Sequence, residues 1–142
     1  MKIKVKYLKE GLDPIAPAHV GEWIDLRAAS DIWAQPMEFV KIPLGVAMQL
    51  PAGFEAIMVP RSSTFENYGI IMINSVGVID HRYCGDNDEW SFPALATRRI
   101  HIPKNARICQ FRLLYEQPNC EITPVDILGN EDRGGFGSTG EM

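Results

Sequence analysis

The sequence predicts an all-β fold, either a barrel or a sandwich of short strands. Short apolar and β-branched runs recur along the chain, and prolines and glycines separate them at intervals of about 8–12 residues. Helical periodicity is confined to one short stretch near residues 62–68. The chain has 142 residues, which is the length of one domain with a core of its own.

The expected strands follow one another along most of the chain. Residues 2–7 alternate lysine with Ile, Val and Tyr, a pattern typical of a half-exposed edge strand. Pro43–Gly45 and Pro51–Gly53 divide the next apolar runs, because proline and glycine interrupt strands. The other strands are expected at 39–42, 46–50, 54–59, 70–73, 76–79, 92–96, 100–102, 107–114 and 121–125.

One short helix is expected over residues 62–68. Ser62 and Ser63 are candidate N-cap residues, and Gly69 can end the helix in the left-handed conformation. Arg61 precedes this helix, whose N-terminus favours an anion. The alternative is that a serine only caps the helix and that Arg61 is a surface charge.

The composition argues against several classes of protein. The formal net charge of −4 provides no basic excess for general binding to nucleic acid. Cys84, Cys109 and Cys120 lack the spacing of metal ligands and predict free thiols in a reducing cytoplasm. The N-terminal segment lacks the apolar core of a signal peptide, and no run reaches membrane-spanning length. We therefore expect a cytoplasmic protein that binds neither nucleic acid nor membranes.

The C-terminal sequence RGGFGSTG, residues 133–140, is dense in glycine. Glycine disfavours helix and strand but lets backbone N–H groups approach an anion closely. Arg133 adds a guanidinium, Ser138 and Thr139 add hydroxyls, and Phe136 adds a flat ring. This set predicts a flexible arm that closes over a nucleotide, with a disordered tail as the alternative. The chain is accordingly divided into a domain at 1–128 and an arm at 129–142.

Four further polar segments interrupt the apolar pattern. They are GEWIDLRAA with Asp25, PRSS with Arg61, NSVGVIDHRYCGD with Asp80, and NARICQF with Gln110. Asp80 follows an apolar hairpin whose backbone edge could read a base. Gln110 lies in an apolar strand, so its amide needs a partner or faces a ligand. Each segment also has an ordinary structural interpretation as a turn, a cap or a satisfied polar group.

Together, these segments and the Gly-rich arm resemble the five sequence motifs of the trimeric dUTPase family over about residues 18–140. GEWIDLRAA, GDNDEW and LGNEDRGG are similar to the Bacillus and phage branch of that family. The resemblance implies a β-barrel of jelly-roll type and a homotrimer with shared active sites. It also implies Mg²⁺-assisted hydrolysis of dUTP to dUMP and pyrophosphate, which limits uracil in DNA and supplies dUMP for thymidylate synthesis.

The resemblance also implies a role for each site residue. Asp80 would activate the water that attacks the α-phosphate, and Asp25 would contact the magnesium through water. Tyr83 would pack under the deoxyribose. The remaining implied substrate-binding residues are Asn74, Gly77, Val78 and Ile79 for uracil, Arg61, Ser62, Ser63 and Gln110 for the phosphates, and Arg133, Phe136, Gly137, Ser138 and Thr139 in the arm.

Some positions depart from the family pattern, and two other functions stay open. His81 and Arg82 stand where the family usually has small or acidic residues. A dCTP deaminase of the same fold would need a glutamate near the base, and Glu89 is the nearby candidate. A nucleotide-gated regulatory binding protein would bind the nucleotide without turnover.

Overall fold

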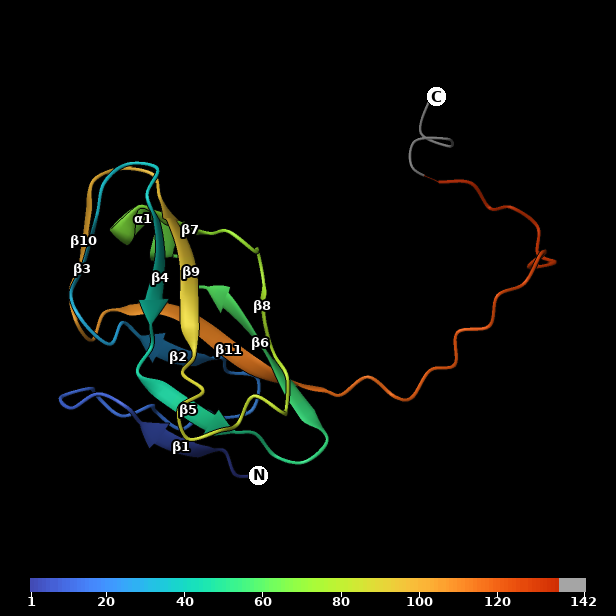
Figure 1. The fold of residues 1–142 in the computed structure, drawn as a ribbon, viewed down its shortest axis with the longest axis horizontal. Coiled ribbons are helices and arrows are strands. Elements are labelled where there is room, and N and C mark those ends of the chain that lie inside the picture. The colour runs from blue at the N-terminus through green and yellow to red at the C-terminus, as the bar shows by residue number, and fades with distance from the viewer. Residues whose placement is uncertain (136–142) are drawn as a thin grey trace.

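The computed structural model describes residues 1–135, and strands dominate it (Figure 1). The all-β prediction is therefore confirmed. In chain order the elements are β1 (Lys4–Tyr7), β2 (Ile24–Arg27), β3 (Ile32–Ala34), β4 (Phe39–Pro43), β5 (Val46–Gln49), β6 (Phe54–Pro60), α1 (Thr64–Tyr68), β7 (Ile70–Met72), β8 (Gly77–Ile79), β9 (Ser91–Ala96), β10 (Ile100–Ile102) and β11 (Arg107–Tyr115).

The strands pair in antiparallel fashion, mostly between segments far apart in sequence. A four-stranded sheet has the order β2-β11-β6-β8, and a three-stranded sheet has the order β4-β9-β7. Two ribbons, β1-β5 and β3-β10, complete the arrangement (Figure 1). Alternate residues of β9 are buried, which is the pattern of a strand with one face toward the core. The two sheets and the ribbons thus enclose one apolar core.

Two aromatic residues near the Asp80 segment belong to this core. Trp90 and Phe92 expose 1% and 0% of their surfaces. The Trp90 ring meets Phe111 of β11 edge-on, with ring centroids 5.0 Å apart. These side chains therefore stabilise the packing of the loop after β8 against β11.

The observed strands differ from the expected ones at three places. Residues 24–27 and 32–34 form β2 and β3, which were not among the expected strands. Residues 121–125 were expected to form a strand, and this prediction was wrong. Pro124 interrupts this segment, and it has no neighbouring strand in the described part of the chain to pair with. A single strand cannot satisfy its own backbone.

Helix α1 begins later than expected, at Thr64. The N-cap is Ser63, but its side chain makes no capping hydrogen bond. Thr64 is buried instead, and its hydroxyl accepts the Arg61 N–H at 2.9 Å and donates to the Ile108 carbonyl at 2.7 Å. Gly69 ends the helix in the left-handed conformation, as predicted, with φ of 63°. The prediction of Ser63 as an N-cap residue is confirmed, although its hydroxyl does not cap a helical N–H, and Thr64 ties the segment before the helix to β11 instead.

Beyond β11 the described chain has neither helix nor strand. Figure 1 shows residues 116–135 extending away from the sheets. Ile122, Val125, Ile127 and Leu128 are exposed in this segment, with Ile122 at 86%. Within residues 1–135, no helix is both long enough and apolar enough to span a bilayer.

Replacement of Thr64 by valine should destabilise the fold. The change keeps the shape but leaves the Arg61 N–H and the Ile108 carbonyl without their partner, at a cost of about 1–3 kcal/mol in the free energy of unfolding. Urea denaturation monitored by tryptophan fluorescence measures it. Thr64→Ser is the matched control, because it retains the hydroxyl and should lose less stability than Thr64→Val. Equal losses in the two variants would contradict this role of the hydroxyl.

Candidate active site

Asp25 lies at the centre of a charged cluster at one end of the four-stranded sheet. Strand β2 places it opposite Gln110 of β11. Its Oδ1 lies 3.1 Å from Arg61 Nε, and its Oδ2 lies 3.4 Å from Arg107 Nη1. One carboxylate between two guanidinium groups leaves a net positive cluster, which suits an anionic ligand.

Arg61 and Gln110 are held against the backbone of neighbouring strands. Arg61 follows β6, and its Nη1 donates to the Arg107 carbonyl at 3.4 Å. Gln110 is half-buried, and its Nε2 donates to the Pro60 carbonyl at 3.3 Å. The sequence left open whether the Gln110 amide has a partner in the protein or faces a ligand. This hydrogen bond gives the amide nitrogen a partner within the protein. Ser62 is exposed and Ser63 half-buried beside the cluster.

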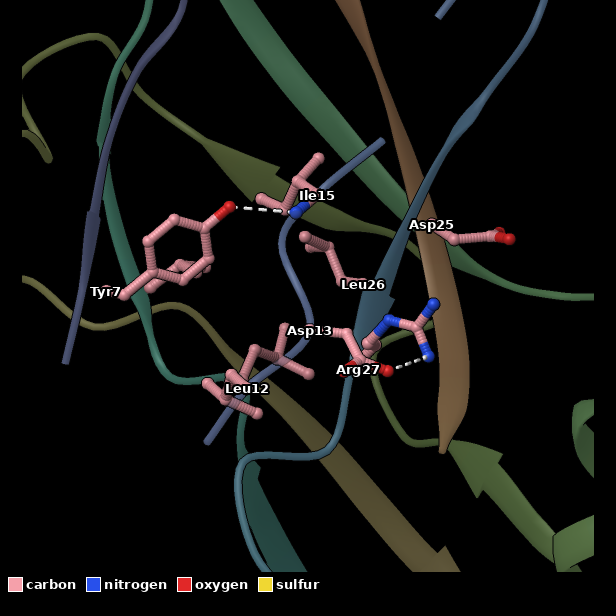
Figure 2. Close-up of a pocket in the computed structure, with 9 residues that line it drawn as sticks. Tyr7, Leu12, Asp13, Ile15, Asp25, Leu26 and Arg27 are labelled. Carbon is pink, nitrogen blue, oxygen red and sulfur yellow. Dashed lines mark hydrogen bonds and ion pairs between the residues drawn. The ribbon is translucent and has the colours of Figure 1, made fainter. Parts of the chain in front are cut away.

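A small cavity lies on the other side of β2 (Figure 2). Its volume of about 10 Å³ holds at most one water molecule. Tyr7 accepts the Ile15 N–H at 2.8 Å across it, and Arg27 lies 3.6 Å from Asp13 at its edge. Figure 2 shows the Asp25 carboxylate projecting away from this space. The cavity is thus a packing gap, and Asp25 faces the opposite side of the strand.

Asp80 forms a second charged group immediately after β8. The Arg82 N–H donates to Asp80 Oδ1 at 2.8 Å, and Arg82 Nη2 donates to Oδ2 at 2.7 Å. Hydrogen bonds from the Arg82 side chain and backbone hold the pKa of Asp80 at about 2, below its usual value of 3.8. The carboxylate is half-exposed. It is ionised at neutral pH and able to accept a hydrogen bond from water.

His81 and Tyr83 connect this loop to the rest of the protein. His81 Nδ1 lies 2.7 Å from Glu116 Oε1, just beyond β11, and 3.4 Å from Asp80 Oδ1. The Tyr83 hydroxyl donates to the Glu89 carbonyl at 2.7 Å, which fixes the ring. Burial, together with the charges of Asp88 and Glu89, raises the pKa of Tyr83.

The segment before Asp80 exposes one backbone edge. Strand β8 contains Gly77, Val78 and Ile79 and is the edge strand of its sheet, pairing with β6 alone within the described residues. A side chain at Gly77 would approach the methyl groups of Met72 and Met58 to 3.1 and 3.2 Å, so glycine fits best there. Asn74 lies in the turn before β8. Free N–H and carbonyl groups on such an edge can pair with a planar polar ligand.

The strand register places the two charged groups at opposite ends of the sheet. Ile79 of β8 pairs with Ala56 near the start of β6, so Asp80 lies beside Glu55. Arg61 follows the other end of β6, six residues beyond Glu55. At about 3.3 Å per residue, roughly 20 Å separates these positions. One chain therefore does not bring Asp80 into contact with Arg61 and Gln110.

The sequence prediction for the arm is only partly covered by the structure. Arg133 is exposed in the extended segment beyond β11. Phe136, Gly137, Ser138 and Thr139 lie outside the described residues.

Four residues of the two charged groups were not singled out as candidates. Arg82 could have been found from the sequence, because an Asp followed two residues later by Arg favours a local contact in a turn. His81 and Arg107 have no such pattern. Glu116 contacts His81 only because β8 and β11 flank the same strand.

Comparisons with known proteins agree on one family. Residues 21–140 match the family model described as dUTPase. The chain is 56% identical over 140 residues to the SPbeta prophage-derived deoxyuridine 5'-triphosphate nucleotidohydrolase of Bacillus subtilis, covering 99% of both proteins. It is 36% identical over 146 residues to the deoxyuridine 5'-triphosphate nucleotidohydrolase of Finegoldia magna, covering 97% of this chain and 99% of the relative.

Solved structures of low identity share the fold, which confirms the jelly-roll-like prediction. The dUTPase of Staphylococcus bacteriophage 80alpha with dUPNHPP superposes with a TM-score of 0.81 at 19% identity, covering 98% of both chains. A mutant dUTPase from phage phi11 of S. aureus, described with a structural Mg(II) ion, superposes with a TM-score of 0.74 at 15% identity, covering 90% of this chain and 99% of the other.

Replacement of Arg82 by glutamine should raise the pKa of Asp80 from about 2 toward 3.8. The neutral side chain removes the charged hydrogen-bond donor that is the largest cause of the depression. Because the folded pKa is depressed, the contact stabilises the native state above about pH 4, and this contribution is lost as the pH falls toward 2. Titration of the Asp80 carboxyl resonance by NMR measures the shift. An unchanged Asp80 pKa would show that Arg82 does not control it.

Proposed function

The chain belongs to the dUTPase family, and from this premise we propose that it hydrolyses dUTP to dUMP and pyrophosphate. The observation that carries the proposal is the match over residues 21–140, which includes Asp25, Arg61, Asp80 and Gln110. The geometry is consistent with it. One group of residues offers an ionised carboxylate, and the other offers two guanidinium groups for an anion.

In the proposed reaction, Asp80 orients a water molecule toward the α-phosphorus and accepts its proton. A bond forms between the water oxygen and phosphorus. The bond from phosphorus to the bridging oxygen breaks, and pyrophosphate leaves with the electron pair. Phosphoryl transfer depends mainly on positioning and charge stabilisation. The Asp80 carboxylate is ionised at neutral pH and can therefore orient the water, but its low pKa makes it a weak base as long as Arg82 is bound to it.

The proposed substrate contacts follow from the two groups. The edge of β8 with Asn74, Gly77, Val78 and Ile79 would read uracil through backbone hydrogen bonds. Tyr83 would pack against the deoxyribose, a role supported by its fixed ring. The proposed phosphate ligands are Arg61, Ser62, Ser63 and Gln110. Residues 129–142 are the proposed arm, in which Arg133, Phe136, Gly137, Ser138 and Thr139 would cover the bound nucleotide.

The family implies Mg²⁺, and the residues present fit an indirectly held ion. In residues 1–135, no group of three or more His, Cys, Asp or Glu side chains is arranged to hold a metal. Asp25 is a single carboxylate whose oxygens already face Arg61 and Arg107. Because the two arginines disfavour direct binding of a cation by Asp25, this residue would contact the magnesium only through water, with the ion held mainly by the triphosphate. When bound, the ion would neutralise charge on the departing pyrophosphate.

We further propose a homotrimer with shared active sites. The separation of roughly 20 Å between Asp80 and Arg61 along β6 supports this assembly, because residues of two chains could complete one site. The extended segment after β11 gives a second argument. It exposes Ile122, Ile127 and Leu128, and such apolar side chains are better accommodated against another subunit than in water.

The proposed cellular role is to limit uracil in DNA and to supply dUMP for thymidylate synthesis. The proposed location is the cytoplasm. Cys84 and Cys120 are exposed free thiols, which supports a reducing compartment.

The structure gives one specific argument against the deaminase alternative. Glu89 is the glutamate that such an enzyme would require near the base. Its Oε2 accepts the Gly45 N–H at 2.9 Å, and its carbonyl accepts the Tyr83 hydroxyl. Glu89 therefore has a structural role. Release of pyrophosphate from dUTP supports the hydrolase, ammonia release from dCTP would support the deaminase, and binding without turnover would support a regulatory binding protein.

Replacement of Asp80 by asparagine should abolish hydrolysis while largely preserving nucleotide binding. Asparagine keeps the size but cannot accept the proton of water, so a loss of several orders of magnitude in kcat is expected. Pyrophosphate release measures turnover, and calorimetry with a non-hydrolysable dUTP analogue measures binding. A variant that retains more than about a tenth of the wild-type rate would remove Asp80 from this role.

Mixing two inactive variants tests the shared site. Asp80→Asn and Arg61→Ala homotrimers should each be nearly inactive, and mixed trimers should regain activity where intact residues from two chains meet. The two proteins are unfolded together, refolded and assayed for pyrophosphate release. The double variant refolded with itself is the matched control. A fully active wild-type monomer in sedimentation, or mixtures no more active than their components, would contradict shared sites.

A further inference from the structure

His81 joins the loop that carries Asp80 to the end of another strand. Its Nδ1 lies 2.7 Å from Glu116 Oε1 and 3.4 Å from Asp80 Oδ1. Both neighbours are carboxylate oxygens. An ionised carboxylate can accept hydrogen bonds but cannot donate them. Nδ1 therefore carries a hydrogen and donates it chiefly to Glu116.

The contact crosses one end of the four-stranded sheet. Strand β6 lies between β8 and β11, and His81 follows β8 while Glu116 follows β11. Glu116 is itself fixed, because its N–H donates to the Gly53 carbonyl at 3.0 Å. The stacked rings of Phe54 and Tyr115, 5.0 Å apart, hold the same end of β6 and β11 together. Glu116 is thus a firm attachment point for the loop.

Arg82, the other partner of Asp80, cannot attach the loop to the sheet. Arg82 binds both carboxylate oxygens, but it belongs to the same turn, and its side chain is 80% exposed. It can orient the carboxylate only relative to the loop. Among the described side-chain contacts of residues 80–82, the His81–Glu116 pair is the one that reaches a different strand.

We propose that His81 is a positioning residue for the hydrolysis, which fixes the Asp80 loop on the sheet by binding Glu116. The inference rests on the proposed function of Asp80. It gives a role to His81, which stands where the family usually has a small or acidic residue. Glu116 is also the first residue after β11, so the same contact links Asp80 to the segment that leads toward the Gly-rich sequence 133–140.

Steady-state hydrolysis of dUTP by the full-length protein tests this role. His81→Ala should lower kcat about 10- to 100-fold, since a small misplacement of a reacting group has effects of this size, and should change KM by less than about 2-fold. Glu116→Ala should do the same. The double variant should be no slower than either single variant, because both remove one contact. His81→Asn should restore most of the rate, since its amide nitrogen replaces Nδ1 as the donor.

A matched control comes from the other half-exposed histidine that faces a carboxylate. His101 of β10 lies 3.4 Å from Asp31, remote from Asp80 in the fold, and His101→Ala should keep the wild-type rate. Thermal unfolding of each variant confirms that the fold is retained. The proposal is overturned by a wild-type kcat in His81→Ala, by no recovery in His81→Asn, or by multiplied losses in the double variant.

A readout independent of turnover separates this inference from the proposed function. The side-chain carboxyl resonance of Asp80 should shift in both His81→Ala and Glu116→Ala, and should return toward its wild-type position in His81→Asn. An unchanged resonance in Glu116→Ala overturns the positioning role even when dUTP is hydrolysed. A wild-type protein that releases no pyrophosphate refutes the proposed function, and with it the catalytic purpose of the contact.

Discussion

The pairing of β11 with both β2 and β6 is the constraint on which the rest of the structure depends. Ile108, Cys109 and Phe111 of this strand are fully buried, so its register cannot slip without exposing the core. That register places Gln110 between Asp25 and Val59. The separate pairing of β8 with β6 leaves the Asp80 loop at the far end of the sheet. The pairing of β11 thus builds one half of the candidate site, and the pairing of β8 with β6 keeps the other half away from it.

The two candidate acids are both paired with arginine, but in physically different ways. Asp25 meets Arg107 of β11 and Arg61, which directly follows β6, so the cluster is attached to three strands of the sheet. Asp80 meets Arg82 of its own turn, and this contact can rearrange without disturbing a strand. An acid held by the sheet, such as Asp25, keeps a fixed position and suits a role beside bound phosphates. An acid in a turn can adjust to a bound water, provided that the turn is attached elsewhere.

Local pattern was sufficient for most of the fold. Alternating apolar residues and the positions of proline and glycine predicted strands such as β10 and the end of α1 at Gly69, because these signals act within a few residues. Strand β2 carries the alternation of a strand in Ile24, Asp25, Leu26 and Arg27 but was overlooked, whereas the three residues of β3 are all apolar and do not alternate. Their backbones become strands only by pairing with β11 and β10. Residues 121–125 show the converse, since they have strand-forming residues but no partner strand within residues 1–135.

For the candidate site, the sequence by itself determined the chemical groups and their order along the chain. Asp25, Arg61, Asp80 and Gln110 were identifiable because each interrupts an apolar segment with a group that needs a partner. The tertiary structure alone decided which of them meet. Contacts such as that of His81 with Glu116 arise where two strands flank a third, and no local pattern encodes them. The physical reason is that charge and hydrogen-bonding capacity belong to single residues, whereas distance between residues is set by the register of the sheet.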